Sequence, residues 1–288
     1  NMAQKKASFD KFYYKIVYYC IYKTKPDFMR NVFPILIAVA LVSLFPSCQK
    51  EVAVETVVET DTVTVNLQRG LIAYYPFTGN ANDSSGNNKH GMLINGTSFS
   101  TDVKNRANSA ASFDGIDDYI SITDGTNYFA TTKLSISFLM NLNNSLTRSM
   151  IFSKGGFTTP TGVVWNSGIT PTGNLNMTVG NPTDACTTSW VDNPSDALNS
   201  TSLIPANTWV HATLIYNMGV QMIYINGALS SAKIDDYNYL KQCASANLKI
   251  GGWWQVDPVS IHGKIDEVRI YNRILAENEI EKLAEERL

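Results

Sequence analysis

The stretch WVHATLIYNMGVQMIYINGALS, residues 209–230, contains two strand–turn–strand patterns in succession. Its short apolar runs are separated first by a segment around Gly219 and then by Asn226-Gly227. Asn-Gly between two such runs indicates a two-residue hairpin turn, because both central residues must tolerate a positive φ. Gly219 indicates a second hairpin, with a loop of about three to four residues. The stretch therefore predicts three antiparallel strands joined by tight turns.

The same pattern of short apolar runs and polar turn clusters continues on both sides of this stretch, from Gly70 onward. Many short strands with almost no helical periodicity are typical of a β-sandwich or a barrel. One helix is expected at the C-terminus, in LAENEIEKLAEERL (275–288), where Ile280, Leu283 and Ala284 share a face. The sequence thus predicts an all-β domain that ends in a short helix.

Composition separates the N-terminal region from the rest of the chain. Of the 288 residues, 44% are apolar, and the formal net charge of −2 gives no basic field that would favour a nucleic-acid partner. Residues 1–47, however, contain seven Lys or Arg and two Asp or Glu, whereas the remainder carries a net charge of −7. A basic start before an acidic body indicates a targeting segment ahead of an exported domain.

The targeting segment is expected at residues 29–47, where Met29 and Arg30 precede an uncharged apolar run that ends at Cys48. The run is shorter than the roughly 20 residues that a membrane-spanning helix needs, although a membrane anchor is the alternative. FPSC (45–48) resembles the lipobox of bacterial lipoproteins, in which the cysteine is lipidated and becomes the first residue. Ser47 and Cys48 fit that pattern, whereas Phe45 and Pro46 depart from it. The resemblance implies a protein anchored to a membrane through lipid at Cys48.

Two segments flank this signal. Residues 1–28 are rich in Lys, Tyr and Ile, as translated AT-rich DNA would be. They are interpreted as DNA upstream of the gene that was translated by mistake, with Met29 as the true start. Residues 48–69 are expected to form an extended spacer, or alternatively a first strand, because Val alternates with Glu and Thr. The acidic QKEVAVE after Cys48 resembles the surface-export signals of Bacteroidetes lipoproteins. It implies a lipid anchor in the outer membrane, with the domain at the cell surface.

Four segments in order carry a resemblance to a known family: GLIAYYPFTGNANDSSGNNKHGMLINGT, ASFDGIDDYISI, WVHATLIY with MIYINGALS, and LKIGGWW with GKIDEVRIYNRILAENEIEKL. Residues 70–288 are thereby identified as a laminin-G-like domain similar to the concanavalin A-like lectin and glucanase domains of bacterial surface proteins. The resemblance implies a two-sheet antiparallel jelly-roll sandwich that binds carbohydrate or acts in adhesion, often with bound Ca²⁺. Ala276 departs from the Ser or Thr that usually caps the last helix.

The resemblance also implies where a structural Ca²⁺ would bind. Asp266 shares a strand face with apolar residues, which is costly for a carboxylate unless it is paired, hydrogen-bonded or bound to a cation. The loop NDSSGNNKHG (82–91) is rich in the oxygen ligands that calcium prefers. The expected ligands are Asp83, Gly86, Asn88, His90 and Asp266. The alternative is that these residues only cap turns, and FDGIDDY (113–119) is interpreted as a structural turn.

The sequence contains no pattern that predicts catalysis. Glucan-cleaving sandwiches carry carboxylates at alternate positions of one strand, whereas Asp266 and Glu267 are adjacent and are expected on opposite faces. The histidines lie far apart and lack zinc-ligand spacing, and His211 is interpreted as structural. In an exported domain, Cys186 and Cys243 are expected to form a disulfide, with two free thiols as the alternative.

Tryptophans are the candidate ligand contacts, because sugar rings stack on exposed aromatic rings. Trp209 begins a strand and is expected in the core, whereas Trp253, Trp254, Trp190 and Trp165 are the candidates for ligand binding. Ordinary packing is the alternative for each one.

Three functions remain open from the sequence. The preferred one is a non-catalytic surface lipoprotein that binds a glycan or a matrix ligand. The alternatives are a glycoside hydrolase of the same sandwich class and a protein-interaction module of the cell envelope.

Overall fold

The structure, a computed structural model, describes residues 65–124, 128–155, 163–182, 197–235, 237–240, 242–243, 247–253 and 259–287. All of them lie in the second of the two units into which the chain divides, Thr62–Leu288. The expected signal segment, Cys48 and most of the spacer are outside the described residues. No helix within these ranges is long and apolar enough to cross a membrane.

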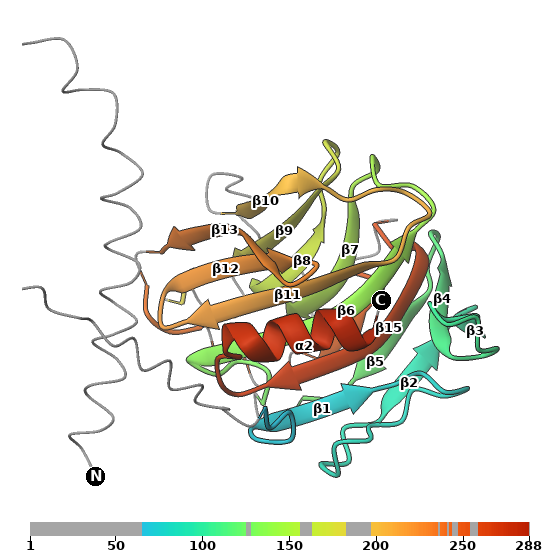
Figure 1. Ribbon diagram of the computed structural model, residues 1–288, viewed down its shortest axis with the longest axis horizontal. Helices are drawn as coiled ribbons and strands as arrows, with labels where there is room; N and C mark the ends of the chain where they lie inside the picture. Colours follow the sequence, from blue (N-terminus) through green and yellow to red (C-terminus); the bar gives the residue numbers. More distant parts are fainter. Residues whose placement is uncertain are drawn as a thin grey trace, which may run out of the picture. The chain divides into compact units, whose positions relative to one another are not determined.

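The described residues form strands β1 to β15 and one helix, α2 (Figure 1). The bounds in the first half are Leu71–Tyr75 (β1), Gly91–Ile94 (β2), Ser98–Ser100 (β3), Ala110–Asp114 (β4), Tyr119–Ile122 (β5), Lys133–Leu142 (β6), Ser149–Gly155 (β7) and Val163–Ile169 (β8). The second half contains Asn174–Val179 (β9), Leu198–Leu203 (β10), Val210–Asn217 (β11), Val220–Ile225 (β12), Ala228–Ile234 (β13), Leu248–Ile250 (β14), His262–Tyr271 (β15) and Glu277–Arg287 (α2).

These strands form two antiparallel sheets. An eight-stranded sheet has the order β13-β12-β11-β6-β15-β4-β3, with β1 also paired to β15. A seven-stranded sheet has the order β10-β9-β8-β7-β14-β5-β2. The predicted two-sheet antiparallel sandwich with a short C-terminal helix is therefore confirmed.

Both predicted hairpins of residues 209–230 are present. The turn between β12 and β13 is Asn226-Gly227, and both residues have a positive φ, 49° and 84°. The turn between β11 and β12 is tighter than predicted, because Met218 and Gly219 alone connect the strands, with φ values of 47° and 94°. Such mirror-image turns match the right-handed twist of the flanking strands. Local sequence therefore specified this part of the larger sheet.

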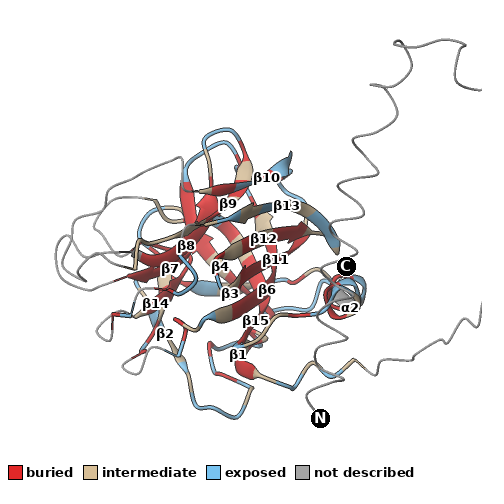
Figure 2. Ribbon diagram, turned by 90° about the vertical axis from the view of Figure 1, so that its left-hand side faces the viewer, coloured by how far each residue is buried: buried red, intermediate tan, exposed pale blue. Residues whose placement is uncertain are grey.

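The main core lies between the two sheets, and the central strands are buried along most of their length (Figure 2). Phe138 and Phe152 pack edge to face, with their ring centroids 4.9 Å apart. Trp165 lies beside Phe152 and donates an indole hydrogen bond to the Phe129 carbonyl at 2.6 Å. Because aromatic rings from both sheets meet here, this layer fixes how the sheets are stacked.

Helix α2 covers the outer face of the larger sheet, over β11 and β6 (Figure 1). Its residues Ile280 and Leu283 join a second apolar cluster with Ile215 and Tyr271 of the sheet. This second cover explains why β11 and β15 are buried on both faces.

The start of α2 is held by an ion pair in place of a side-chain cap at Ala276. The Arg273 guanidinium donates to both carboxylate oxygens of Glu279, at 2.6 and 2.8 Å. The same carboxylate accepts the Ala276 N–H at 2.8 Å, which is half of a capping box. Burial raises the pKa of Glu279, but the hydrogen bonds and the charge of Arg273 outweigh this effect, and the pKa lies below its ordinary value.

Candidate functional site

A groove of about 360 Å³ lies where β10 and β13 approach each other beside the start of β11. β10 is the outermost strand of the smaller sheet, and β13 is the outermost strand of the larger one. The groove therefore lies at a seam between the two sheets. Its walls contain one aromatic residue, Trp209, and a group of polar side chains: Thr201, Ser202, Thr208, Asn226 and Ser230.

Trp209 is only half-buried and lines this groove. The prediction that it lies in the core is wrong, because β11 begins one residue later, at Val210. Two exposed leucines line the same groove: Leu203 of β10 is 62% exposed, and Leu229 of β13 is 53% exposed. An apolar surface that is rimmed by polar groups is typical of a binding site.

Hydrogen bonds hold the polar wall in place. The Asn226 side-chain carbonyl accepts the His211 N–H at 3.0 Å, and the Asn226 N–H donates to the His211 carbonyl at 2.8 Å. Thr201 of β10 and Ser230 of β13 are linked by hydrogen bonds of 3.0 and 3.1 Å. Contacts across the seam thus join the sheets and position the hydroxyls and the amide before any ligand arrives.

The charge of the lining separates this groove from two other cavities. Among the described residues, none of the twelve that line the groove is charged. A cavity of about 410 Å³ is lined by Lys89 and Tyr128, and the Lys89 ammonium lies 3.3 Å from the centre of the Tyr128 ring. A third cavity, of about 320 Å³, contains Asp114, Asp118 and Lys264. The Trp209 groove is thus the neutral one of the three.

The tryptophans proposed as ligand contacts are not exposed where the structure describes them. Trp165 is fully buried in the core, so the prediction that it contacts a ligand is wrong. Trp253 is 7% exposed, and its carbonyl accepts a hydrogen bond from the Lys249 ammonium at 2.7 Å. Trp190 and Trp254 lie outside the described residues, and so does Cys186.

Asp83, the first expected calcium ligand, organises its own loop. Its Oδ1 accepts the N–H groups of Tyr74 and Ser85, and its Oδ2 accepts the Ser85 hydroxyl and the Lys89 N–H, all within 2.9 Å. Burial raises the pKa of Asp83, but these hydrogen bonds outweigh it and place the pKa below its ordinary value. Since a carboxylate offers about four lone-pair positions, none remains for a cation.

The other expected ligands in this loop do not complete a calcium site. His90 is exposed, and its Nδ1 accepts the Asp83 N–H at 3.1 Å. Asn88 is exposed and has a positive φ of 55°, and Gly86 has a φ of 90°, as turn residues do. With the Asp83 lone pairs used in this way, the four loop residues do not form a calcium site by themselves, and the loop has the character of a capped turn.

Asp266 faces a different group of charges. Its side chain is 1% exposed, and its Oδ1 accepts the Glu267 N–H at 2.7 Å. Within the described residues, Oδ2 has no hydrogen-bond partner. Burial, followed by repulsion from Glu267, raises the pKa of Asp266 to about 8, and Asp102 and Arg106 also act on it. Burial and the neighbouring Glu267 carboxylate thus favour the neutral form of Asp266.

A β-bulge at Glu267 accounts for this arrangement. β15 pairs with β4 through Ile265 and with β1 from Val268 onward, so one edge of the strand changes partner between them. Glu267 has a φ of 54°, and its carboxylate accepts the Tyr74 hydroxyl at 2.6 Å and an Arg269 N–H at 3.1 Å. The regular alternation on which the opposite-face prediction depended is interrupted at this residue.

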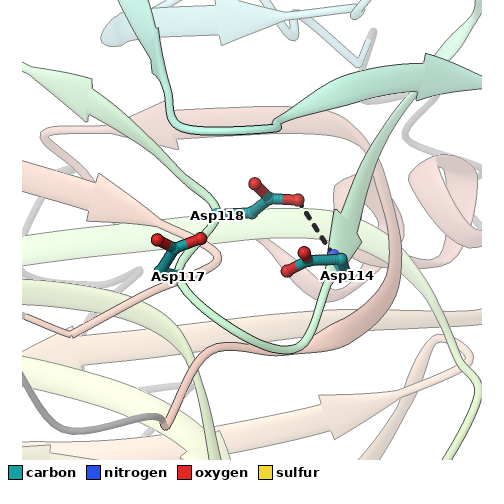
Figure 3. A group of neighbouring side chains, drawn as sticks. All are labelled: Asp114, Asp117 and Asp118. Atoms are coloured by element: carbon teal, nitrogen blue, oxygen red, sulfur yellow. Dashed lines mark hydrogen bonds between the residues drawn. The ribbon is translucent and has the colours of Figure 1, made fainter.

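The acidic loop of residues 114–118, which connects β4 of the larger sheet to β5 of the smaller sheet, is stabilised by its own hydrogen bonds (Figure 3). One carboxylate oxygen from each of Asp114, Asp117 and Asp118 lies within 4.8 Å of the others. Asp118 is 2% exposed and accepts the Asp114 N–H at 3.0 Å, while Asp114 accepts the Ile116 N–H at 2.8 Å. Burial, with repulsion from Asp114 and Asp117, raises the pKa of Asp118. These bonds support the interpretation of FDGIDDY as a structural turn.

The three histidines have separate partners. His211 is 1% exposed, and its Nε2 lies 2.9 Å from the Ser137 hydroxyl, in keeping with a structural role. His262 is exposed and lies 2.8 Å from the Asn143 amide.

Comparison with known proteins agrees with the fold. A family model described as the concanavalin A-like lectin/glucanases superfamily matches residues 114–281. No curated protein sequence matches the chain. Domain 4 of AbnA, a GH43 extracellular arabinanase from Geobacillus stearothermophilus solved with arabinotriose, is 22% identical with a TM-score of 0.53. This match covers 74% of the present chain and 98% of the arabinanase domain.

Binding domains of botulinum neurotoxin are similar in structure as well. The domain of botulinum neurotoxin DC in complex with rat synaptotagmin II is 18% identical with a TM-score of 0.56, and the one in complex with SialylT is 16% identical with a TM-score of 0.56. Each match covers 77% of the present chain and 53% of the toxin chain, so the chain spans about half of the toxin binding domain. At these identities the likeness shows the fold alone.

Proposed function

Because the chain belongs to the concanavalin A-like lectin/glucanase superfamily, we propose that it is a non-catalytic carbohydrate-binding or adhesive protein whose ligand occupies the Trp209 groove. The single observation that carries this proposal is the half-buried indole beside hydroxyl and amide groups. Sugar rings present apolar C–H faces and a rim of hydroxyls, and this wall offers a matching apolar face and matching hydrogen-bonding groups.

The structural neighbours support a binding role on this type of sandwich. One of them was solved with arabinotriose, one with SialylT, and one with rat synaptotagmin II. The first two favour a glycan as the ligand class. The third keeps a protein-interaction module of the cell envelope as the second candidate.

The placement of the carboxylates supports a role without bond cleavage. Hydrolysis by two carboxylates requires that both face a substrate across an open cleft. Asp266 and Glu267 are 1% and 7% exposed, and Glu267 is occupied by Tyr74 and Arg269. In the acidic loop, Asp118 is 2% exposed and accepts the Asp114 N–H of the same loop. Release of reducing sugar from a polysaccharide panel by the purified domain would contradict this part of the proposal.

We expect Trp209→Ala to weaken glycan binding by at least about tenfold, which corresponds to about 1.4 kcal/mol. The reason is that alanine removes the stacking face and leaves the hydroxyl wall intact. A glycan array identifies the ligand, and isothermal titration of that ligand measures the affinities of the wild type and the variant.

Two exposed aromatic residues outside the groove supply matched controls. Tyr239→Ala removes a ring that is 44% exposed, and it should leave the affinity unchanged. Tyr128→Ala tests the cavity beside Lys89, where Tyr128 is 45% exposed. Loss of binding in Tyr128→Ala with retention in Trp209→Ala would move the site to that cavity and overturn the present assignment.

The proposal also includes export, a lipid anchor at Cys48 and a disulfide between Cys186 and Cys243. Cys243 is 2% exposed and disulfide-bonded, which supports the pairing.

We expect the mature protein to begin at Cys48 with attached acyl chains, and Cys48→Ser to release it from the outer-membrane fraction. Peptide mass spectrometry without reduction tests both the acyl chains and the pairing. A mature protein that keeps residues 29–47 would contradict the anchor.

A further inference from the structure

We propose that the Trp209 groove selects uncharged sugar residues and rejects those that carry a carboxylate, such as uronic and sialic acids. This inference rests on the proposed function of the groove, and it adds the chemical class of the ligand. The observations that carry it are the neutral lining, the bonding of its polar groups and the contrast with the charged cavities elsewhere on the domain.

The polar groups of the groove match neutral sugar hydroxyls. The Ser202 hydroxyl can donate and accept, as a sugar hydroxyl does. The Thr208 hydroxyl donates to the Ala206 carbonyl at 3.2 Å, and the Ser230 hydroxyl accepts the Thr201 N–H at 3.0 Å, so each offers a sugar hydroxyl its remaining lone-pair position. Asn226 uses its side-chain oxygen to accept the His211 N–H, which leaves its NH₂ group as the part of the amide not used in that bond. The groove can thus exchange hydrogen bonds with a neutral ring without leaving a charge uncompensated.

A carboxylate in the same position would lose water without gaining a cationic partner. Proteins recognise carboxylates with Arg or Lys, because charge-assisted hydrogen bonds compensate for the desolvation of the anion. In the described residues that line this groove, neither Arg nor Lys is present. An acidic sugar therefore incurs a desolvation cost here that its neutral counterpart avoids.

The surroundings of the indole favour a neutral ring for a second reason. Leu203 and Leu229 expose apolar side chains on the two strands that flank Trp209. Apolar neighbours reduce the access of water to a stacked ring, and they strengthen the penalty for an unpaired charge. Among the described lining residues Trp209 is the one aromatic residue, so it supplies the stacking face for one sugar ring.

The test uses sugars that differ only in charge. Galactose and glucose oligosaccharides are compared with the corresponding galacturonate and glucuronate oligosaccharides, and with the methyl esters of these acids, by isothermal titration. We expect each acid to bind at least about tenfold more weakly than its neutral counterpart, and each methyl ester to recover the affinity. The methyl ester keeps the ring and the stereochemistry, so it isolates the effect of charge.

The second part of the experiment introduces a positive charge into the groove by substitution. Ser202→Lys places a cation in the lining and should narrow the ratio between neutral and acidic ligands by at least about threefold. Ser84→Lys, at an exposed serine outside the groove, is the matched control and should leave the ratio unchanged. The two variants add the same charge, so general attraction of anions affects both equally.

The outcomes separate the two proposals. If an acid binds as tightly as its neutral counterpart and Trp209→Ala abolishes that binding, the charge selectivity is overturned while the groove remains the glycan site. If no sugar on the glycan array binds, or if Trp209→Ala leaves all affinities unchanged, the proposed function itself is overturned.

Discussion

Asp266→Asn is expected to stabilise the domain at pH 8 and to remove most of a pH-dependent loss of stability in the wild type. The pKa of Asp266 is raised from 3.8 to about 8 in the folded protein, chiefly by burial. Between these two values the folded state holds one more proton than the unfolded state. The contribution of the Asp266 proton to the free energy of unfolding is therefore fully present below about pH 4. It is lost as the pH rises towards 8, by up to about 1.4 kcal/mol per pH unit.

Urea unfolding at pH 5 and at pH 8, in the presence of EDTA, measures this effect. The wild type should be less stable at the higher pH, whereas Asp266→Asn should show a much smaller difference. Glu281→Gln, at an exposed carboxylate of α2, is the control and should keep the wild-type pH dependence. An equal slope in the wild type and in Asp266→Asn would contradict the prediction. Stabilisation by added calcium that is lost in Asp266→Asn would contradict it as well, by showing an ionised Asp266 that holds a cation.

The second large effect is expected from the ion pair between Lys154 and Asp124. The Lys154 ammonium lies 2.8 Å from Asp124 Oδ2, and both side chains are 0% exposed. The carboxylate also accepts the N–H groups of Tyr128 and Phe129, at 2.7 and 3.2 Å. Lys154→Met removes the cation and leaves a buried carboxylate without its counter-charge. We expect the free energy of unfolding to fall by about 3–5 kcal/mol.

The double variant Lys154→Met/Asp124→Asn separates the value of the pair from the cost of an orphaned charge. It should recover a large part of the stability lost in Lys154→Met, because neither side chain then carries a charge and the introduced amide oxygen can still accept an N–H bond. Chemical denaturation of the wild type, both single variants and the double variant gives the coupling energy. Additive losses would show that the two side chains act independently.

Local features of the fold could be predicted from the sequence, because their signals lie within a few residues. Asn226-Gly227 gave the position and type of one hairpin turn, and Gly219 gave the position of another. The length of the second loop was overestimated, since Met218 adopts a positive φ that is unusual for a residue with a β-carbon. The way in which the start of α2 is stabilised could not be predicted either. Ala276 lacks a capping side chain, and the Arg273–Glu279 ion pair that compensates for it becomes visible only in three dimensions.

The candidate site was harder to predict, because exposure at the end of a strand depends on the other sheet. Trp165 is followed by polar residues in the sequence, yet it lies in the main core beside Phe152 of the neighbouring strand. Trp209 precedes an apolar strand, yet it faces the seam between β10 and β13. For Asp83 the sequence allowed either a metal ligand or a turn cap, and the four donors that surround it decide for the cap. No sequence signal distinguishes the two, because the donors are mostly main-chain groups.

The seam held by Thr201 and Ser230 has a mechanical consequence. The two sheets are otherwise held together mainly by apolar packing, which lacks directional bonds. A glycan bound against both edge strands, β10 and β13, would add contacts that connect the two sheets. Force applied to a glycan bound in this way would act on both sheets at once. Binding of the glycan would therefore also resist displacement of one sheet along the other.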